Sequence, residues 1–492
     1  MSQKNYSNRR EIRRILLVQP PIHPDSLVLG HMEPLGLETL AAAIPEEIET
    51  RILDLRVEVQ RRIDRELAGE LLRFSPDMVG VTGITIDFPE AVNVLRTVRK
   101  VHPGAWTVVG GHHASVCPED YFIPEVDFIV RGSGVRAFPL LLDAIARGSD
   151  FSGIQGLAFR EDGEFHPASD FAEPVQLDRT PLPRRELVAR YRKKYSFYGT
   201  TMGLITTSQG CPNRCTFCAC WIILNGKYTA RPVNDVVREL TSIPEKHVFF
   251  GDDHTFGNVK RAYHLYEAIR DAGLDKTFEA YSRADTIVNN PDLFRKWASI
   301  GLTGLTVGYE ALNDDSLNVY NKEGSVEINR RANDILLACG ITNFAHFLIR
   351  PDFTGPDFQA ITDYGRELGI IHPIYAVLTP LPGTPLHQQS SEIHPDMHPY
   401  YDLAHPLLPR KLSAKSFYTE YRALYARNYS VGRLLTVWKR KLVNLFTGKY
   451  RNTPAMLMTP NLLSIIVTRW VLARQFRRGS KQLKKFIERC ES

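Results

Sequence analysis

Two blocks of alternating strand and helix patterns set the strongest limit on what this 492-residue chain can fold into. Helical spacing in the first block occurs at Leu35–Ile44, Phe88–Val101 and Ala137–Ala146. Short apolar runs typical of buried strands occur at Ile12–Val18, Glu49–Leu55, Asp77–Gly83, Trp106–Gly110 and Val126–Val130. This alternation predicts a doubly wound parallel sheet over residues 1–150, with its ligand site at the carboxyl ends of the strands.

The second block follows a turn-rich segment, residues 151–199, that we interpret as a linker containing a hairpin near Gly156–Arg160. Helices are expected at Val233–Ser242, Val259–Ala272, Asn290–Ile300, Val326–Cys339 and Phe358–Leu368. Strands are expected at Leu204–Thr207, His247–Phe250, Phe278–Tyr281, Gly304–Val307, Asn343–Phe347 and Tyr375–Leu378. Six such units over residues 200–390 predict a (β/α)6 partial barrel. Residues 391–492 then form a helical region, which includes Ser413–Tyr429 and a basic tail.

The most informative motif is a cluster of cysteines at the end of the first predicted barrel strand. Cys211, Cys215 and Cys218 have C-x3-C-x2-C spacing, and four of the chain's seven cysteines lie within ten residues. Thiolates bind iron–sulfur clusters, and three of them leave one iron of a [4Fe–4S] cluster open to an outside ligand. Zinc is the alternative, but structural zinc prefers four protein ligands, and Cys220 lies only two residues after Cys218.

The motif and its surroundings resemble the radical SAM superfamily, in the subgroup that also binds cobalamin. In the barrel the resemblance includes the segments FFGDDHTF (249–256), SRAD (282–285), VGYEALNDDSL (307–317) with NKEGS (321–325), and TPLPGTPL (379–386). In the N-terminal region it includes PLGLETLAA, DMVGVTGIT, VVGGHHAS and DFIVRGSG. It covers roughly residues 12–430, and hopanoid C-3 methylases are the most similar members.

The resemblance implies three cofactors and assigns residues to each of them. Cys211, Cys215 and Cys218 would hold the [4Fe–4S] cluster, whose open iron would take the amino and carboxylate groups of S-adenosylmethionine (SAM). The SAM contacts expected on the barrel are Asp252, Arg283, Gly308 and Glu310. Glycine lets backbone approach a large corrin closely. The residues expected to face cobalamin are Gly83, Thr85, Gly110, Gly111, His112, Gly132 and Gly134.

One literal match to a cobalamin motif is rejected because of its position. Residues 252–257 spell D-x-H-x-x-G, whose histidine ligates cobalt in mutase-type domains, but they lie inside the predicted barrel. The corresponding loop of the N-terminal sheet lacks the motif, and its histidines, His23 and His31, are expected to be solvated. We therefore expect cobalamin to bind without a protein histidine on cobalt.

The resemblance also implies the reaction: SAM is cleaved to a 5′-deoxyadenosyl radical, and methylcobalamin donates a methyl group to an unactivated carbon. The expected substrate is a hopanoid or similar polycyclic lipid, or another small molecule, and the electron donor is of the flavodoxin or ferredoxin type. The alternatives are a non-methylating cyclase of the porphyrin type and a cobalamin or SAM sensor without turnover. Labelled methyl transfer separates methylase from cyclase, and 5′-deoxyadenosine release separates both from a sensor.

The charge distribution sets the C-terminal tail apart from the rest of the chain. Val431–Ser492 contains fourteen Lys or Arg and two acids, 14 − 2 = +12, while the whole chain is +6, which leaves −6 for the rest. A net charge of +6 is too small to indicate nucleic acid as a partner. Basic amphipathic segments containing Trp bind membrane interfaces. We expect a cytoplasmic protein whose tail contacts the inner face of the membrane; the alternative is a tail that packs on the protein body.

Overall fold

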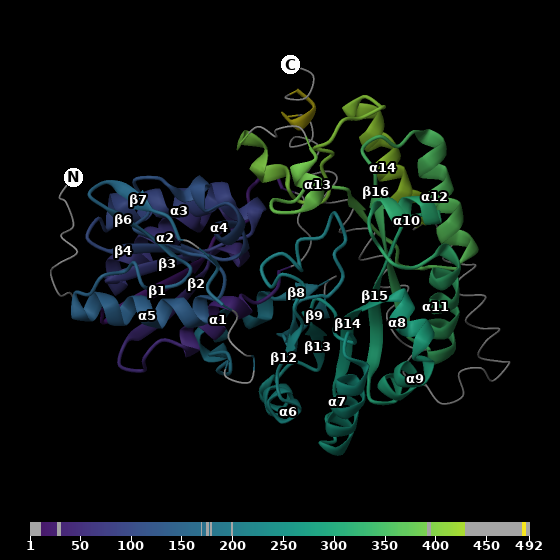
Figure 1. The fold of residues 1–492 in the computed structure, drawn as a ribbon, viewed down its shortest axis with the longest axis horizontal. Coiled ribbons are helices and arrows are strands. Elements are labelled where there is room, and N and C mark those ends of the chain that lie inside the picture. Colours follow the sequence, from purple (N-terminus) through teal and green to yellow (C-terminus); the bar gives the residue numbers. More distant parts are fainter. Residues whose placement is uncertain are drawn as a thin grey trace.

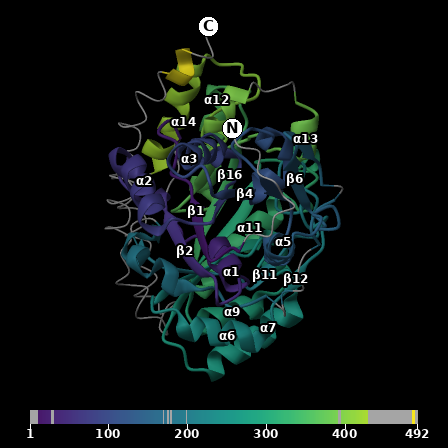
Figure 2. The same cartoon turned by 90° about the vertical axis from the view of Figure 1, so that its left-hand side faces the viewer.

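The computed structural model describes residues 11–26, 31–168, 170–173, 177, 180–197, 200–390, 395–428 and 485–488. Two α/β domains lie next to each other, the N-terminal sheet on one side and a curved sheet on the other (Figure 1). The view turned by 90° looks over the N-terminal domain toward the barrel behind it (Figure 2). The expected fold class is confirmed. The domain boundaries remain predictions.

The N-terminal domain contains a seven-stranded sheet of order β2-β1-β3-β4-β5-β6-β7. Its strands are β1 (Arg14–Gln19), β2 (Glu49–Asp54), β3 (Met78–Thr82), β4 (Trp106–Gly110), β5 (Phe128–Val130), β6 (Leu157–Glu161) and β7 (Glu164–His166). The first five are parallel, and β6 and β7 continue the sheet as an antiparallel hairpin. The hairpin expected in the linker is therefore an extension of the first sheet.

Helices cover both faces of this sheet, which explains why its strands are apolar without alternation. Its helices are α1 (Leu35–Ala42), α2 (Ile63–Phe74), α3 (Phe88–Val101), α4 (His112–Val116) and α5 (Gly134–Arg147). Ile15 and Leu17 pack in one core with α1 and α5, whereas Leu16 and Val18 pack in a second core with α2 and α3. The sequence pattern did not predict α2.

The second domain contains a six-stranded, fully parallel sheet of order β10-β13-β14-β15-β16-β17. Its strands are β10 (Gly203–Ile205), β13 (His247–Phe250), β14 (Thr277–Arg283), β15 (Leu302–Glu310), β16 (Thr342–Ile349) and β17 (Ile374–Val377). Its outer helices are α6 (Val233–Ser242), α7 (Val259–Asp271), α9 (Pro291–Ser299), α11 (Val326–Cys339) and α12 (Gly355–Glu367). The predicted partial barrel is present. α12 begins before the expected Phe358, since Thr354 and Asp357 cap it reciprocally.

Several short elements complete the fold around these two sheets. The helical segments are η1 (Leu55–Val57), η2 (Gln60–Arg62), η3 (Thr85–Asp87), η4 (Pro118–Tyr121), η6 (Arg185–Lys194), α8 (Ala284–Asn289), α10 (Asp314–Val319), α13 (Pro385–Gln388), η7 (Pro395–Tyr400) and α14 (Ala414–Asn428). The strand pairs are β8 (Ser196–Phe197) with β9 (Thr200–Thr201), and β11 (Ser208–Gln209) with β12 (Thr229–Ala230). α14 packs on α12, where the Phe417 and Phe358 rings lie 5.4 Å apart.

A buried ionic cluster joins the two domains. Arg185, on η6, bonds Glu33 of the N-terminal domain at 2.7 Å and also Glu239 on α6 of the barrel. Glu33 in turn accepts the backbone N–H of Leu204 at 2.6 Å, at the start of the first barrel strand. Because buried charges are stable only when paired, these contacts hold the two domains against each other.

Candidate active site between the two domains

The loop that carries the three cysteines directly follows β11, at the carboxyl end of the first barrel strand. Gly210 opens it with φ +82°, and a Cβ there would lie 1.9 Å from the Lys227 carbonyl oxygen, so glycine is required. The Trp221 indole donates to the Cys215 carbonyl at 3.1 Å, and the Thr216 amide donates to the Tyr320 carbonyl at 2.9 Å. The loop is therefore held by barrel residues on both sides.

Two basic side chains lie near the cysteine thiols. Burial raises the pKa of Cys215 to about 11, although the nearby cations Lys322 and Arg283 act in the opposite direction. The Cys220 thiol hydrogen-bonds Cys218 and lowers the pKa of Cys218. In the described part of the chain, the Sγ atoms of Cys211, Cys215 and Cys218 do not all lie within 4.8 Å of one another. A single zinc ion needs closer ligands than that, whereas a cluster spaces its cysteines more widely.

Glu310 ends β15 and lies close enough to this loop for its charge to act on Cys215. Its carboxylate accepts from Lys322 Nζ at 2.7 Å and lies 3.2 Å from His346 Nδ1. Burial by itself would raise its pKa, but Lys322 and His346 outweigh burial and lower the pKa to about 2. Lys322 also donates to the Gly308 carbonyl at 2.8 Å. The sequence reasoning had selected Gly308 and Glu310 but not the two partners, Lys322 and His346.

The other two expected SAM contacts differ in what they offer a ligand. Arg283 pairs with Asp285 at 3.0 Å, donates to the Glu323 carbonyl at 2.8 Å and lies among the groups that act on Cys215. Asp252 is fully buried and accepts the Thr207 hydroxyl at 2.6 Å and the Ser208 amide at 3.0 Å. Asp252 therefore joins the ends of β10 and β13. The neighbouring Asp253, which the sequence reasoning missed, faces the interdomain cavity instead.

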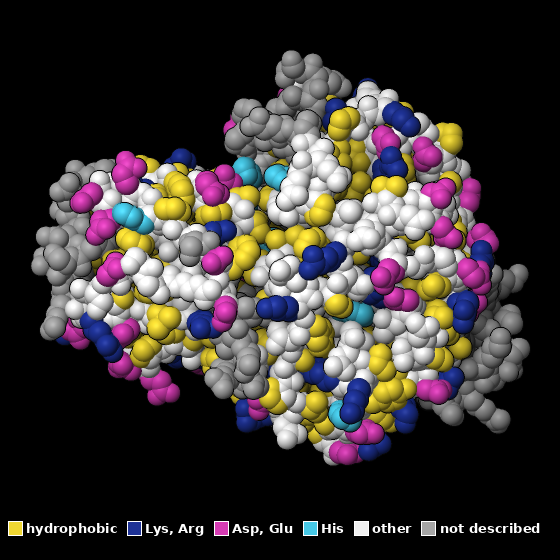
Figure 3. Space-filling view, viewed as in Figure 1, with side chains coloured by type: hydrophobic (Ala, Val, Ile, Leu, Met, Phe, Trp, Pro, Cys, Tyr) yellow, Lys and Arg dark blue, Asp and Glu magenta, His cyan; other side chains and the backbone are white. Residues whose placement is uncertain are grey.

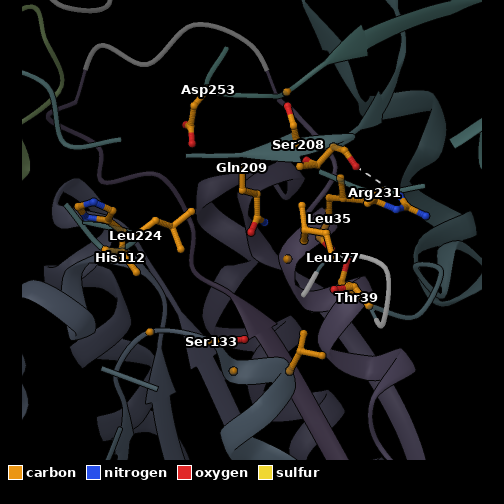
Figure 4. Close-up of a pocket in the computed structure, with 18 of the residues that line it drawn as sticks. Leu35, Thr39, His112, Ser133, Leu177, Ser208, Gln209, Leu224, Arg231 and Asp253 are labelled. Carbon is orange, nitrogen blue, oxygen red and sulfur yellow. Dashed lines mark hydrogen bonds between the residues drawn. The ribbon is translucent and has the colours of Figure 1, made fainter. Parts of the chain in front are cut away.

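A cavity of about 540 Å³ lies between the carboxyl ends of the two sheets (Figure 4). Of the residues expected to face cobalamin, His112, Gly132 and Gly134 line it. The barrel contributes further lining residues that the sequence reasoning did not select: Thr206, Ser208, Gln209, Cys220, Arg231 and Asp253. Cys220 and Ala219 directly follow the last cysteine of the triad, so the cavity borders the cluster loop.

Four of the residues expected to face cobalamin do not line this cavity: Gly83, Thr85, Gly110 and Gly111. Gly111 has φ +95°, and a Cβ there would lie 2.7 Å from Thr82 Oγ1 and 2.8 Å from the Gly83 carbonyl oxygen. These two glycines therefore close the turns after β3 and β4. Thr85 lies 3.3 Å from His113 Nδ1, inside the domain.

Buried polar atoms without partners indicate that the cavity takes a polar ligand. His112 Nε2, Ser208 Oγ and Arg231 Nη2 are buried and have no hydrogen-bond partner among the described residues. All three residues line the cavity. Unpaired buried donors and acceptors are costly, so a ligand that pairs with them would be stabilised. The amide side chains of a corrin offer both the donors and the acceptors that these atoms need.

The histidines considered for cobalt lie elsewhere. His254, in the D-x-H-x-x-G sequence, is buried inside the barrel, 3.3 Å from Thr286 Oγ1, and burial lowers its pKa to about 4. His31 forms a backbone bridge to Ser196, and His23 Nε2 lies 3.9 Å from a Glu90 oxygen. None of the three lines the cavity.

A cobalamin-type sheet, a partial barrel and a three-cysteine loop on one cavity define a radical enzyme with two cofactor domains. Residues 27–142 match the B12 binding domain family, and residues 205–364 match the Radical SAM superfamily. The hopanoid C-3 methylase of Methylococcus capsulatus is 30% identical over 81% of this chain and 78% of its own length. The chain therefore belongs to the cobalamin-binding radical SAM enzymes.

Two further similarities place the chain within this family. The anaerobic magnesium-protoporphyrin IX monomethyl ester cyclase of Rubrivivax gelatinosus is 24% identical over 76% of this chain and 70% of its own. The structure of OxsB, a cobalamin-dependent SAM radical enzyme with aqua-cobalamin and SAM bound, matches with a TM-score of 0.67 and 16% identity. That match covers 97% of this chain and 84% of OxsB. The predicted cofactors, a [4Fe–4S] cluster, SAM and cobalamin, are those of the family, and the protein is a cobalamin-dependent radical SAM methyltransferase that needs a reductant.

Proposed function

We propose that the protein methylates an unactivated carbon of a hopanoid, at C-3, or of a similar polycyclic lipid. The similarity to hopanoid C-3 methylase over four-fifths of the chain supports this substrate. The single observation that carries the proposed chemistry is the shared cavity, which N-terminal loops and the end of the cluster loop line together. When bound, SAM and the cluster supply a radical that removes hydrogen from carbon, and methylcobalamin supplies the methyl group.

The chain's own residues bind and orient the cofactors in this proposal. Cys211, Cys215 and Cys218 would hold the cluster. Arg283 and the Glu310–Lys322 pair offer a cation and an anion beside Cys215, which suits the carboxylate and amino groups of SAM. A second cavity of about 280 Å³, lined by Glu310, Tyr320 and other polar residues, would take the nucleoside part. His112, Ser208 and Arg231 would pair with cobalamin.

The electron donor and the membrane contact complete the proposal. A flavodoxin or ferredoxin type of donor would reduce the cluster, and the basic tail would bring the enzyme to its lipid. In the part of the chain that the structure describes, no helix combines the length and the apolar character that crossing a bilayer requires. The contact that we propose is a peripheral one through residues 431–492, which lie outside the described residues apart from 485–488.

A magnesium-porphyrin type of cyclase is the second candidate, because relatives with that activity align with three quarters of the chain. The test is incubation of the reduced holoenzyme with methyl-labelled SAM and hopanoid lipid, followed by mass spectrometry. We expect 5′-deoxyadenosine and one labelled methyl group on the lipid, and loss of one methylated lipid in a deletion strain. Deoxyadenosine without methyl transfer would support the cyclase, and the absence of both products would contradict the hopanoid substrate.

A further inference from the structure

Alternate side chains of β14 form a row on the inner face of the barrel sheet. Phe278 and Ala280 pack in the core beneath the outer helices, together with Ile269 of α7 and Leu336 of α11. Because successive strand residues point to opposite faces, Glu279, Tyr281 and Arg283 lie on the other, concave face. Figure 1 shows the helices on the outside of this sheet, so the row faces into the barrel.

The surroundings of Glu279 are aromatic. A Cβ on Gly304 would lie 2.8 Å from Phe344 Cε2 and 3.2 Å from Glu279 Cγ, so Phe344 and Glu279 meet across this glycine. Toward the barrel opening, Tyr281 contacts Phe249 edge-on, with ring centroids 5.2 Å apart. An ionisable side chain therefore lies between apolar walls at the inner end of the row.

No hydrogen bond or ion pair to the Glu279 carboxyl is present within the described part of the chain. Burial alone raises its pKa to about 7. The Glu279 side chain is half-buried. Taking a carboxyl out of water without a partner destabilises a fold, and a leucine would cover the same apolar neighbours without that cost. Such residues are retained at functional sites, where a ligand provides the missing partner.

The row connects Glu279 to the site of the chemistry. Arg283 lies four residues from Glu279, which is roughly 13 Å along a strand. It is close enough to Cys211 and Cys215 for the charges of these cysteines to act on it. Tyr281 lies between Glu279 and Arg283 in the row, and the charges of two cavity-lining residues, Cys220 and Asp253, act on it. A substrate that lay along this row would extend from the cofactors to Glu279.

We propose that Glu279 anchors a hydrogen-bond donor, a hydroxyl or an amine, on an otherwise apolar substrate and so selects the carbon that is presented to the radical. This inference rests on the proposed function for the position of the reacting carbon. It adds that the substrate has one polar group, and that this group lies roughly 13 Å from the reacting carbon, which is the distance from Glu279 to Arg283 along the strand.

The test compares wild type, Glu279→Gln, Glu279→Leu and the exposed control Glu267→Leu as reduced holoenzymes. Release of 5′-deoxyadenosine is measured with the lipid fraction and, separately, the aqueous fraction of cells that express the protein. Diplopterol, a hopanoid alcohol, and diploptene, the hydrocarbon without its hydroxyl, are also used as defined probes. Melting temperature without substrate is the readout that does not depend on turnover.

We expect Glu279→Leu to melt at or above the wild-type temperature while its stimulation by substrate falls roughly ten- to hundredfold, as expected for one lost hydrogen bond in a buried site. Glu279→Gln should keep the response to a hydroxyl donor and lose the response to a cationic amine. If only the aqueous fraction stimulates 5′-deoxyadenosine release, the lipid proposal is contradicted. The comparison of wild type with Glu279→Leu then tests the role of Glu279 with that fraction. Equal responses of wild type and Glu279→Leu to both fractions, or a Glu279→Leu protein that melts well below wild type, would overturn the inference.

Discussion

Glu310 has a backbone conformation that few residues other than glycine adopt, with φ +62°. It ends β15, where the register against β16 shifts between Gly308 and Glu310. Its carboxylate pairs with Lys322 and lies beside His346. Such backbone is costly and is found where a site requires it, which supports a ligand-binding role for this carboxylate.

Gly308 makes room for the Glu310–Lys322 pair, and this suggests a first mutation. A Cβ at position 308 would lie 2.2 Å from Glu310 Oε1 and 2.6 Å from Lys322 Nζ. Gly308→Ala should therefore displace the pair and raise the Kd for SAM by about tenfold or more, as expected for a disturbed charged hydrogen bond. Calorimetry measures the affinity, and iron content should stay unchanged. The control is Gly365→Ala on α12, where a Cβ has no neighbour within 4 Å; equal SAM affinities for both variants would contradict the prediction.

The cysteines provide the second prediction at this scale. Alanine at Cys211, Cys215 or Cys218 should abolish SAM cleavage and most bound iron, because a cluster needs all three thiolates. Cys220→Ala should keep both, since Cys220 lines the cavity and hydrogen-bonds Cys218 and Asp253. Iron analysis and 5′-deoxyadenosine release measure the outcome. Retained iron in Cys215→Ala, or lost iron in Cys220→Ala, would refute the ligand assignment.

At the scale of elements, the loops after β4 and β5 bring cobalamin-domain residues to the cavity. The β4–α4 loop presents His112, and the β5–α5 loop presents Gly132 and Gly134. Gly132 has φ +84°, and a Cβ there would lie 2.6 Å from the Ala172 carbonyl oxygen, so the backbone itself forms this wall. Strand order reverses at β1 in this sheet, and ligands of such sheets bind at the carboxyl ends beside that point.

This arrangement predicts how cobalt is ligated. We expect the EPR spectrum of the bound cobalt(II) form to lack splitting from a protein imidazole. His112→Ala should leave that spectrum unchanged while weakening cobalamin binding severalfold, through loss of one hydrogen bond. Burial lowers the pKa of His112, so its ring is neutral and can pair with an amide of the corrin. An imidazole splitting that disappears in His112→Ala would show instead that this histidine ligates cobalt.

At the scale of the whole molecule, buried carboxylates link domain docking to pH. Glu38 lies beside Glu33 and Arg185 in the ionic cluster, 4.0 Å from Arg185 Nη1. Burial and the Glu33 charge raise its pKa to about 8. The folded protein therefore holds this proton more tightly than the unfolded chain does. Stability should fall as pH rises from the ordinary glutamate pKa to about 8, and level off above it.

Glu38→Gln tests this directly, because glutamine keeps the shape and cannot ionise. Urea unfolding at pH 6 and pH 8.5 should show a loss of wild-type stability on the order of a few kcal/mol that the variant lacks. Glu47→Gln, at an exposed position, serves as the control and should follow wild type. Identical pH dependence in wild type and Glu38→Gln would exclude Glu38 as the source.

The tail is the other feature of the whole molecule that can be tested. Residues 485–488 pack on the body, where the Phe486 ring is fully buried, 4.9 Å from Tyr400 and 4.8 Å from His405. A truncation would uncover these rings, so changing charge is the better test. On the face shown in Figure 3, acidic and basic side chains of the described residues are interspersed. The chain without residues 431–492 carries a net charge of −6, so attraction to an anionic membrane would come from the tail.

We expect a triple variant, in which Lys439, Arg440 and Lys441 are changed to Gln, to bind anionic vesicles roughly a hundredfold more weakly at low salt. This follows from about 1 kcal/mol of binding free energy per charge, and vesicle flotation measures it. The effect should shrink at high salt, because screening acts within about 10 Å at 0.1 M. Changing the exposed Lys193, Lys246 and Lys260 to Gln is the matched control. If both triple variants float like wild type, the tail is a packing element and the lipid proposal loses its support from membrane contact.

The amino-acid sequence by itself determined the two α/β blocks, the cysteine loop and the family. Hydrophobic period and ligand spacing are local properties, so α6 and α11 were predicted to the residue. Only the tertiary structure decided which polar residues share a site. Asp253 and not Asp252 faces the cavity, and Lys322 and His346 are the partners of Glu310. These pairings depend on strand register, on loop conformation and on how two sheets dock, which join residues far apart in the chain and leave no periodic pattern within it.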